Sequence, residues 1–240
     1  MGHALLTRVL LGGAGLAGCI ALLSSAAHAA DNADFGQRPI IVSATVRPLA
    51  PSLFGTLTLP IRPARYLDDW ERARRDASNV PAMQALIAPA RGLSPQQEIN
   101  YVQAAVTRQI HWRSDATEWG YHDYWASAAE TLQHGSGDEE DRAIVKMQAL
   151  RTLGFSTRDL YLTMGTDKVG GPITVLIARL DGRYYVLDDT GGTPYTTDRR
   201  PEFTPSLTFG YGGFWIHGYP VASRTPQIRT AASAVASAAH

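Results

Sequence analysis

Two stretches of the chain repeat apolar residues every three or four positions, the spacing that places them on one face of an α-helix. The first runs from Ile99 to Ile110 and follows Ser94-Pro95-Gln96-Gln97, in which a capping serine and a first-turn proline signal a helix start. The second, Glu139 to Leu153, is followed by a glycine, a common residue just after a helix end. Both patterns predict helices that bury one face in a core.

Three later runs have the composition of β-strands: Leu160 to Met164, Thr174 to Leu180 and Tyr184 to Leu187. Asp181-Gly182, between the last two, is a tight-turn signal. Because the helical patterns come first and the strands follow without alternating with them, the order predicts an α+β fold with an antiparallel sheet. The segment from Arg113 to His134 has no sustained period, and we expect a long, ordered loop there.

The first thirty residues have the features of an export signal. A weakly basic stretch ends at Arg8, an apolar run extends from Val9 to Leu23, and Ala27-His28-Ala29 has the small-x-small pattern of a cleavage site. We therefore expect residues 1–29 to be a signal peptide and the protein to be periplasmic. Leu16-Ala17-Gly18-Cys19 also fits a lipoprotein processing site, so a lipid anchor at Cys19 is an open alternative and the only membrane attachment we expect.

The remaining residues suit an N-terminal arm (30–63), one folded domain (64–220) and a tail (221–240). The tail is rich in alanine and serine and is predicted to be disordered. Cys19 is the only cysteine, so disulfides cannot stabilise the domain and packing must. Lys plus Arg and Asp plus Glu both number 22, and this unclustered balance argues against a nucleic-acid partner.

One segment of the sequence, Trp125 to Phe155, is long and distinctive enough to compare with known families. At its centre is Gly135-Ser136-Gly137-Asp138-Glu139-Glu140-Asp141. Together with Val175 to Asp188 and Tyr195 to Gly218, this segment resembles the bacterial transglutaminase-like cysteine peptidases. The resemblance implies a papain-like fold in which a central helix packs on an antiparallel sheet. A thiol at the start of that helix would be activated by the helix dipole and assisted by a histidine and an aspartate from adjacent strands.

The catalytic positions of that family are only partly preserved here. The family's central block reads Gly-Asp-Cys-Glu-Asp, and Glu139 holds the place of the cysteine. The histidine would fall at Ile173, while Asp188 matches the third catalytic residue. A carboxylate is a far poorer acyl-transfer nucleophile than a thiolate, and Ile173 cannot transfer a proton. We therefore expect a catalytically degenerate member that binds a polypeptide segment, from the periplasm or cell surface, in the remnant cleft.

The acidic residues at the start of the second helix have two explanations. Acidic side chains in a first helical turn complement the helix dipole, and aspartate is a preferred cap. By resemblance, Asp138 and Glu140 would instead bind calcium, whose ligands are oxygen atoms. We expect no other cofactor.

Two further alternatives concern the same region. Glu139 and Asp188 would keep the protein a hydrolase if they formed a carboxylate pair that activates water. The aromatic residues Trp119, Tyr124 and Trp125 either line a peptide groove or pack over the predicted loop.

Overall fold

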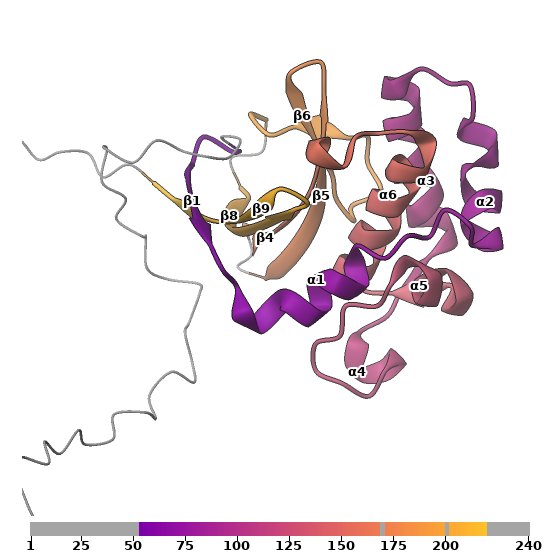
Figure 1. The fold of residues 1–240 in the computed structure, drawn as a ribbon, viewed down its shortest axis with the longest axis horizontal. Coiled ribbons are helices and arrows are strands. Elements are labelled where there is room, and N and C mark those ends of the chain that lie inside the picture. The colour runs from indigo at the N-terminus through magenta and orange to yellow at the C-terminus, as the bar shows by residue number, and fades with distance from the viewer. Residues whose placement is uncertain (1–52, 169–170, 200–201, 220–240) are drawn as a thin grey trace, which may run out of the picture. The chain divides into compact units, whose positions relative to one another are not determined.

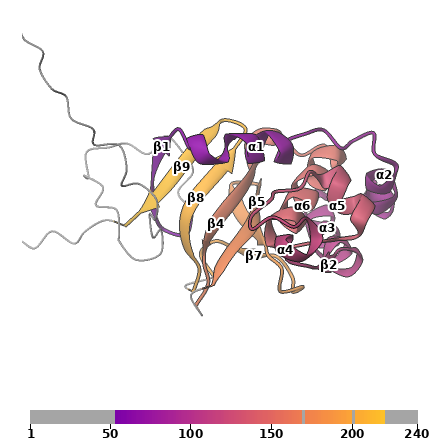
Figure 2. The same ribbon diagram turned by 90° about the horizontal axis from the view of Figure 1, so that it is seen from below.

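The core of the fold is an antiparallel sheet whose strands lie in the order β1-β9-β8-β4-β5-β6-β7. In the computed structural model, which describes residues 53–168, 171–199 and 202–219, the helices gather beside this sheet (Figure 1; Figure 2). Its strands are β1 (Leu57–Ile61), β4 (Leu160–Thr166), β5 (Pro172–Leu180), β6 (Arg183–Leu187), β7 (Tyr195–Thr196), β8 (Thr204–Gly210) and β9 (Gly213–Gly218). A separate parallel pair joins β2 (His111–Trp112) to β3 (Ser136–Gly137).

The longest helices are α3 and α6, and they pack on each other beside β4 and β5. In chain order the helical elements are η1 (Ala64–Tyr66), α1 (Leu67–Ala73), α2 (Pro81–Ile87), η2 (Ala88–Ala90), α3 (Pro95–Gln109), α4 (Asp115–Glu118), α5 (Ala128–His134), α6 (Glu139–Leu153) and η3 (Thr157–Asp159). None of the helices in the described ranges is both long and apolar enough to cross a membrane.

Alternate side chains of the central strands point to opposite faces of the sheet. On one face, Leu176 and Ala178 of β5 pack with the buried apolar residues of α3 and α6. On the other face, Val175 and Ile177 join a second apolar cluster that includes Trp215. On β5, side chains of even-numbered residues therefore face the helices, and those of odd-numbered residues face away from them.

The helix α6 is buried on all sides in its middle part, whereas its apolar spacing predicted that only one face would be buried. Every residue from Asp141 to Leu150 is buried, because α3, α5 and the sheet surround the helix. Its polar residues in this stretch must therefore find partners inside the protein. Gln148, for example, donates a hydrogen bond to the backbone carbonyl oxygen of Ala73 at 2.9 Å.

The predicted α+β fold, with a central helix on an antiparallel sheet, is confirmed. The helix expected after Ser94 begins there with a capping box in which the Ser94 N–H donates to Gln97 at 3.0 Å. Asp181 and Gly182 form the predicted tight turn, and both have positive φ angles, 50° and 77°. Leu57–Ile61, the end of the predicted arm, pairs with β9 as an edge strand.

The prediction of one long loop from Arg113 to His134 was wrong. The segment contains α4 and α5, and α5 starts at a second capping box in which the Ser127 N–H donates to Glu130 at 2.8 Å. A seven-residue helix carries too few apolar positions to display a period. The predicted signal peptide, the Cys19 lipid anchor, residues 30–52 of the arm and the tail from 221 lie outside the described residues.

Candidate functional site

Carboxylate groups from two distant segments meet at the N-terminus of α6. Asp115, at the start of α4, lies beside Asp138 and Asp141, and one carboxylate oxygen from each falls within 4.8 Å of the others. Asp138 also belongs to a second group of the same size with Glu139 and Glu140. These five residues, called the acidic cluster below, join the start of α4 to the N-cap and first turn of α6.

Two carboxylates of the acidic cluster are held by backbone N–H groups through one oxygen only. Asp115 accepts a hydrogen bond from Tyr124 N–H on Oδ2 at 2.5 Å, and Asp141 accepts one from Ala126 N–H on Oδ1 at 2.7 Å. Their other oxygens, Oδ1 of Asp115 and Oδ2 of Asp141, are buried without a hydrogen-bond partner, as is Oδ1 of Asp138. An anchored carboxylate with one free oxygen is suited to binding a cation.

Gly137 allows this close approach. A Cβ atom at this position would lie 2.6 Å from both Cβ and Oδ2 of Asp141. Any side chain at residue 137 would therefore push the Asp141 carboxylate out of place. The glycine before Asp138 thus contributes to the geometry of the acidic cluster.

Helix capping does not account for Asp138. The residue occupies the N-cap position of α6, but its side chain makes no capping hydrogen bond. The buried, unpartnered oxygen of Asp138 instead belongs to the group formed with Asp115 and Asp141. The dipole of α6 still favours negative charge at this end of the helix.

Burial raises the pKa values of Asp138, Glu140 and Asp141 far above the ordinary range. The pKa of Asp138 rises to about 9, because the group is desolvated and lies beside Glu140 and Asp115. The pKa of Asp141 rises to about 8 through burial and the neighbouring Asp138, and that of Glu140 rises to about 7, chiefly through burial. Without a bound cation, Asp138 and Asp141 therefore favour the protonated form at neutral pH.

The acidic cluster fits a hard cation such as calcium. Calcium takes six to eight oxygen ligands, which carboxylates, backbone carbonyls and water supply in proteins. Asp115, Asp138 and Asp141 offer three buried oxygens that lack hydrogen-bond partners, and Glu140 adds a further carboxylate next to Asp138. A cation would take the place of the protons that otherwise keep these buried carboxyl groups neutral.

The other two positions that the resemblance assigns to catalytic residues are Ile173 and Asp188. Ile173 of β5 packs against the second apolar cluster, the one that faces away from the helices. Asp188 follows β6, and its Oδ2 accepts a hydrogen bond from the hydroxyl of Tyr195 at 3.0 Å, while its Oδ1 accepts from Thr190.

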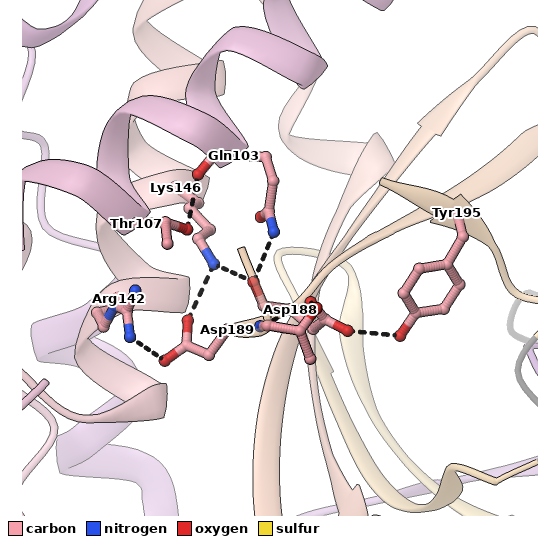
Figure 3. A network of polar contacts seen from close by, with 8 residues as sticks. Gln103, Thr107, Arg142, Lys146, Asp188, Asp189 and Tyr195 are labelled. Atoms are coloured by element: carbon pink, nitrogen blue, oxygen red, sulfur yellow. Dashed lines mark hydrogen bonds and ion pairs between the residues drawn. The ribbon is translucent and has the colours of Figure 1, made fainter. Parts of the chain in front are cut away.

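A buried polar network ties the chain around Asp188 to the helices (Figure 3). Lys146 of α6 donates to the backbone carbonyl oxygen of Asp188 at 2.7 Å and to Oδ1 of Asp189 at 3.1 Å. Gln103 of α3 donates to the same carbonyl at 2.8 Å, and Arg142 lies 2.9 Å from Oδ2 of Asp189. The segment after β6 is therefore fixed to both α3 and α6.

The three aromatic side chains considered for a peptide groove differ in burial. Trp125 is fully buried, and its ring stacks on Tyr66 and meets Phe209 edge-on, with centroids 5.8 and 5.1 Å apart. Trp119 and Tyr124 are half-buried, and their ring centroids lie 5.2 Å apart. Of the two alternatives, core packing therefore explains Trp125, and only Trp119 and Tyr124 reach the surface.

Two other aromatic residues of this region are well exposed. Trp112 is 57% exposed and Tyr121 63%. Trp112 lies opposite Gly137 in the β2–β3 pair, so it is next to the start of the acidic cluster. Sequence reasoning did not single out Trp112, because an isolated tryptophan in a two-residue strand has no periodic signal.

A central helix that carries a polar site at its N-terminus and packs on an antiparallel sheet defines the transglutaminase-like fold. The family of bacterial transglutaminase-like cysteine proteinases matches residues 61–193, more than half of the sequence, and the chain belongs to this family. No curated protein matches it.

Solved structures with the same fold include LapG of Legionella pneumophila. One LapG structure is 20% identical, with a TM-score of 0.50, and the match covers 66% of this chain and 90% of LapG. A calcium-bound LapG structure is 22% identical, with a TM-score of 0.51, and the match covers 65% of this chain and 91% of that one. At these identities the likeness establishes the fold alone.

Sequence reasoning missed Asp115 as a member of the site. It lies 23 residues before Asp138, inside the segment that was predicted to be a loop. No local pattern distinguishes this buried residue from the aspartates that lie at the surface. Only the packing of the α4 region against α6 brings its carboxylate to the acidic cluster.

Proposed function

We propose that this protein is a catalytically inactive member of the family that binds a polypeptide segment instead of cutting it. The observation that carries the proposal is the carboxylate of Glu139 at the first position of α6, where the family's motif has its cysteine. The only cysteine of the sequence, Cys19, lies outside the folded residues 53–219. A covalent thiol mechanism therefore has no nucleophile.

The surroundings of Ile173 and Asp188 support the same proposal. Ile173 is packed among apolar side chains and offers no atom that transfers a proton. The alternative, hydrolysis by a Glu139–Asp188 pair, requires both carboxylates to face one water molecule. Asp188 instead bonds to Tyr195 and Thr190 with its side-chain oxygens, so the geometry favours binding over hydrolysis.

Exposed aromatic residues support a polypeptide as the ligand. Trp112 and Tyr121 present large apolar surfaces, and Trp112 lies beside the start of α6. Tryptophan and tyrosine are enriched among the residues that dominate protein–protein binding energy. The family's proteinase activity implies a groove that accepts a protein chain. The export signal that we predict from the sequence makes a periplasmic or cell-surface protein the natural partner.

Calcium at the acidic cluster is the second part of the proposal. The buried free oxygens of Asp115, Asp138 and Asp141 support it, and so does the calcium-bound LapG structure. Such an ion would bind the α4 segment to the first turn of α6 and neutralise the carboxylates there. It would stabilise the surface that carries Trp112 without taking part in chemistry.

Cross-linked capture tests the proposed function. The exported protein is incubated with periplasmic and cell-surface extract and cross-linked, and bound chains are identified by mass spectrometry as intact or cut. We expect an intact partner that is lost with Glu139→Arg and with Trp112→Ala. Glu71→Arg, an exposed position on α1, serves as the matched control and should retain the partner.

Cut partners would overturn the proposal, provided that Glu139→Gln abolishes the cutting. A partner that Glu139→Arg and Trp112→Ala both retain would show that binding occurs elsewhere on the protein.

A further inference from the structure

A cavity of about 450 Å³ lies at the C-terminal end of α6, the end opposite Glu139. Its walls come from three parts of the chain. The first turn of α3 supplies Pro95 and Glu98, the end of α6 supplies Leu153, and the β5–β6 turn supplies Leu180 and Asp181. Since an α-helix rises about 1.5 Å per residue, the length of α6 puts roughly 20 Å between this cavity and the acidic cluster.

Glu98 is an unpaired acid in the wall of this cavity. The residue is only 9% exposed, and within the described part of the chain its carboxylate has no hydrogen-bond or ion-pair partner. Burial raises the pKa of Glu98, and no neighbouring cation lowers it. The carboxylate opens into the cavity without a partner and is therefore available to a cationic ligand there.

The remaining polar groups make the cavity more negative. Asp159 and Asp181 also line it, and Arg179 is its only cationic side chain. Arg179 is already engaged with Asp159, at 3.4 Å from Oδ1, and so does not neutralise Glu98.

Apolar groups form the rest of the wall. Leu153, Phe155 and Leu180 line the cavity together with Pro95. A negative site with an apolar wall suits a ligand that carries a positive charge at the end of an aliphatic stem. Lysine and arginine side chains have this construction, because their methylene groups pack on apolar surface while the charged end stays polar.

We propose that this cavity binds a lysine or arginine side chain of a partner polypeptide, with Glu98 as the counter-ion. The aliphatic stem lies against Leu153, Phe155 and Leu180, and the ammonium or guanidinium group meets Glu98. The site lies away from the acidic cluster, so this inference does not depend on what the other end of α6 binds.

Titration with small probes tests the proposal on the full chain. The probes are N-acetyl-arginine amide and N-acetyl-lysine amide, and N-acetyl-norleucine amide serves as a control that keeps an aliphatic stem but lacks the charge. We expect saturable NMR shifts from Leu153, Phe155 and Leu180 with the two cationic probes, and at least tenfold weaker binding of norleucine. Affinity for the cationic probes should fall as the pH is lowered and Glu98 takes up a proton.

Two variants decide the role of Glu98. Glu98→Gln keeps the shape of the side chain and removes the charge, so it should fold and bind the cationic probes at least tenfold more weakly. Glu71→Gln, at an exposed position on α1, should bind as the unaltered protein does. The proposal is overturned if no probe gives saturable shifts, if norleucine binds as well as arginine, or if Glu98→Gln keeps the affinity.

Discussion

The ammonium nitrogen of Lys146 lies 2.7 Å from the backbone carbonyl oxygen of Asp188, deep inside the protein. Lys146 has no exposed surface, and burial lowers its pKa, while the carboxylate of Asp189 acts in the opposite direction. This contact joins the middle of the central helix to the end of β6 (Figure 3). The position of Asp188, aligned with a catalytic residue of the family, thus depends on a lysine two turns along α6 from Glu139.

Replacing Lys146 by methionine should destabilise the protein by about 2–4 kcal/mol. Removing one partner of a buried ion pair leaves the other without compensation, although Asp189 keeps Arg142 at 2.9 Å. Urea unfolding measures the change. Lys168→Met is the matched control, because its pair with Glu202 lies at the surface, and should change stability by less than about 1 kcal/mol. Equal effects for the two variants would show that the buried network contributes little.

Calcium should raise the melting temperature, by about 5–10 °C at a concentration 100 times its Kd, because it binds the folded chain alone. Protons compete with the ion for Asp138 and Asp141, so the rise should be larger at pH 8 than at pH 5. Asp141→Asn should remove most of it, and Asp68→Asn, at an exposed site, should not. Identical melting in calcium and in chelator at both pH values would exclude the site.

The buried His217 should make the protein less stable in mild acid. Its Nδ1 lies 2.7 Å from Thr56 Oγ1, and its Nε2 lies 2.7 Å from Thr208 Oγ1. Thr56 donates its own proton to the Leu53 carbonyl, so Nδ1 carries the hydrogen and neutral His217 accepts at Nε2. Burial lowers the pKa of His217 from 6.5 to about 4.

The unfolded chain therefore takes up this proton as the pH falls below about 6.5, whereas the folded protein does not until about pH 4. The His217 contribution to the unfolding free energy should decline over that window by up to about 3 kcal/mol. Comparing the unaltered protein with His217→Gln at pH 7 and pH 4.5 isolates the effect, because the acidic cluster is common to both. Parallel pH profiles for the two proteins would rule out this role.

Trp125→Ala should cost about 3–5 kcal/mol of stability, because it removes a large, fully buried side chain from the core. Trp112→Ala should change stability by no more than about 0.5 kcal/mol, since its ring is largely in solvent. Chemical denaturation separates the two. If Trp125→Ala changes stability little but abolishes partner binding, Trp125 lines the peptide groove and is not a core residue.

Glu139→Cys should remain without peptidase activity. It restores a thiol at the start of α6, but Ile173 gives that thiol no base. A fluorogenic peptide should therefore stay intact in the presence of Glu139→Cys. Turnover by Glu139→Cys alone would mean that a histidine elsewhere in the chain acts as the base.

Much of the architecture followed from spacing along the chain. The period from Ile99 to Ile110 gave α3, the run from Glu139 to Leu153 gave α6, and Asp181-Gly182 marked the turn between β5 and β6. Such signals are local, because helices, strands and turns are specified by neighbours within a few residues. The glutamate at residue 139, where the resemblance places the family's cysteine, was likewise visible without a structure.

The sequence alone determined the fold class, the family resemblance and the absence of a thiol from the domain. Tertiary packing decided the rest: that Asp115 joins Asp138 and Asp141, that Trp125 is core, and that Glu98 lines a second cavity. These relationships join residues far apart in the chain. The packing of distant elements decides whether a carboxylate is solvated or buried and which groups lie beside it. The spacing of residues along the chain does not specify that packing.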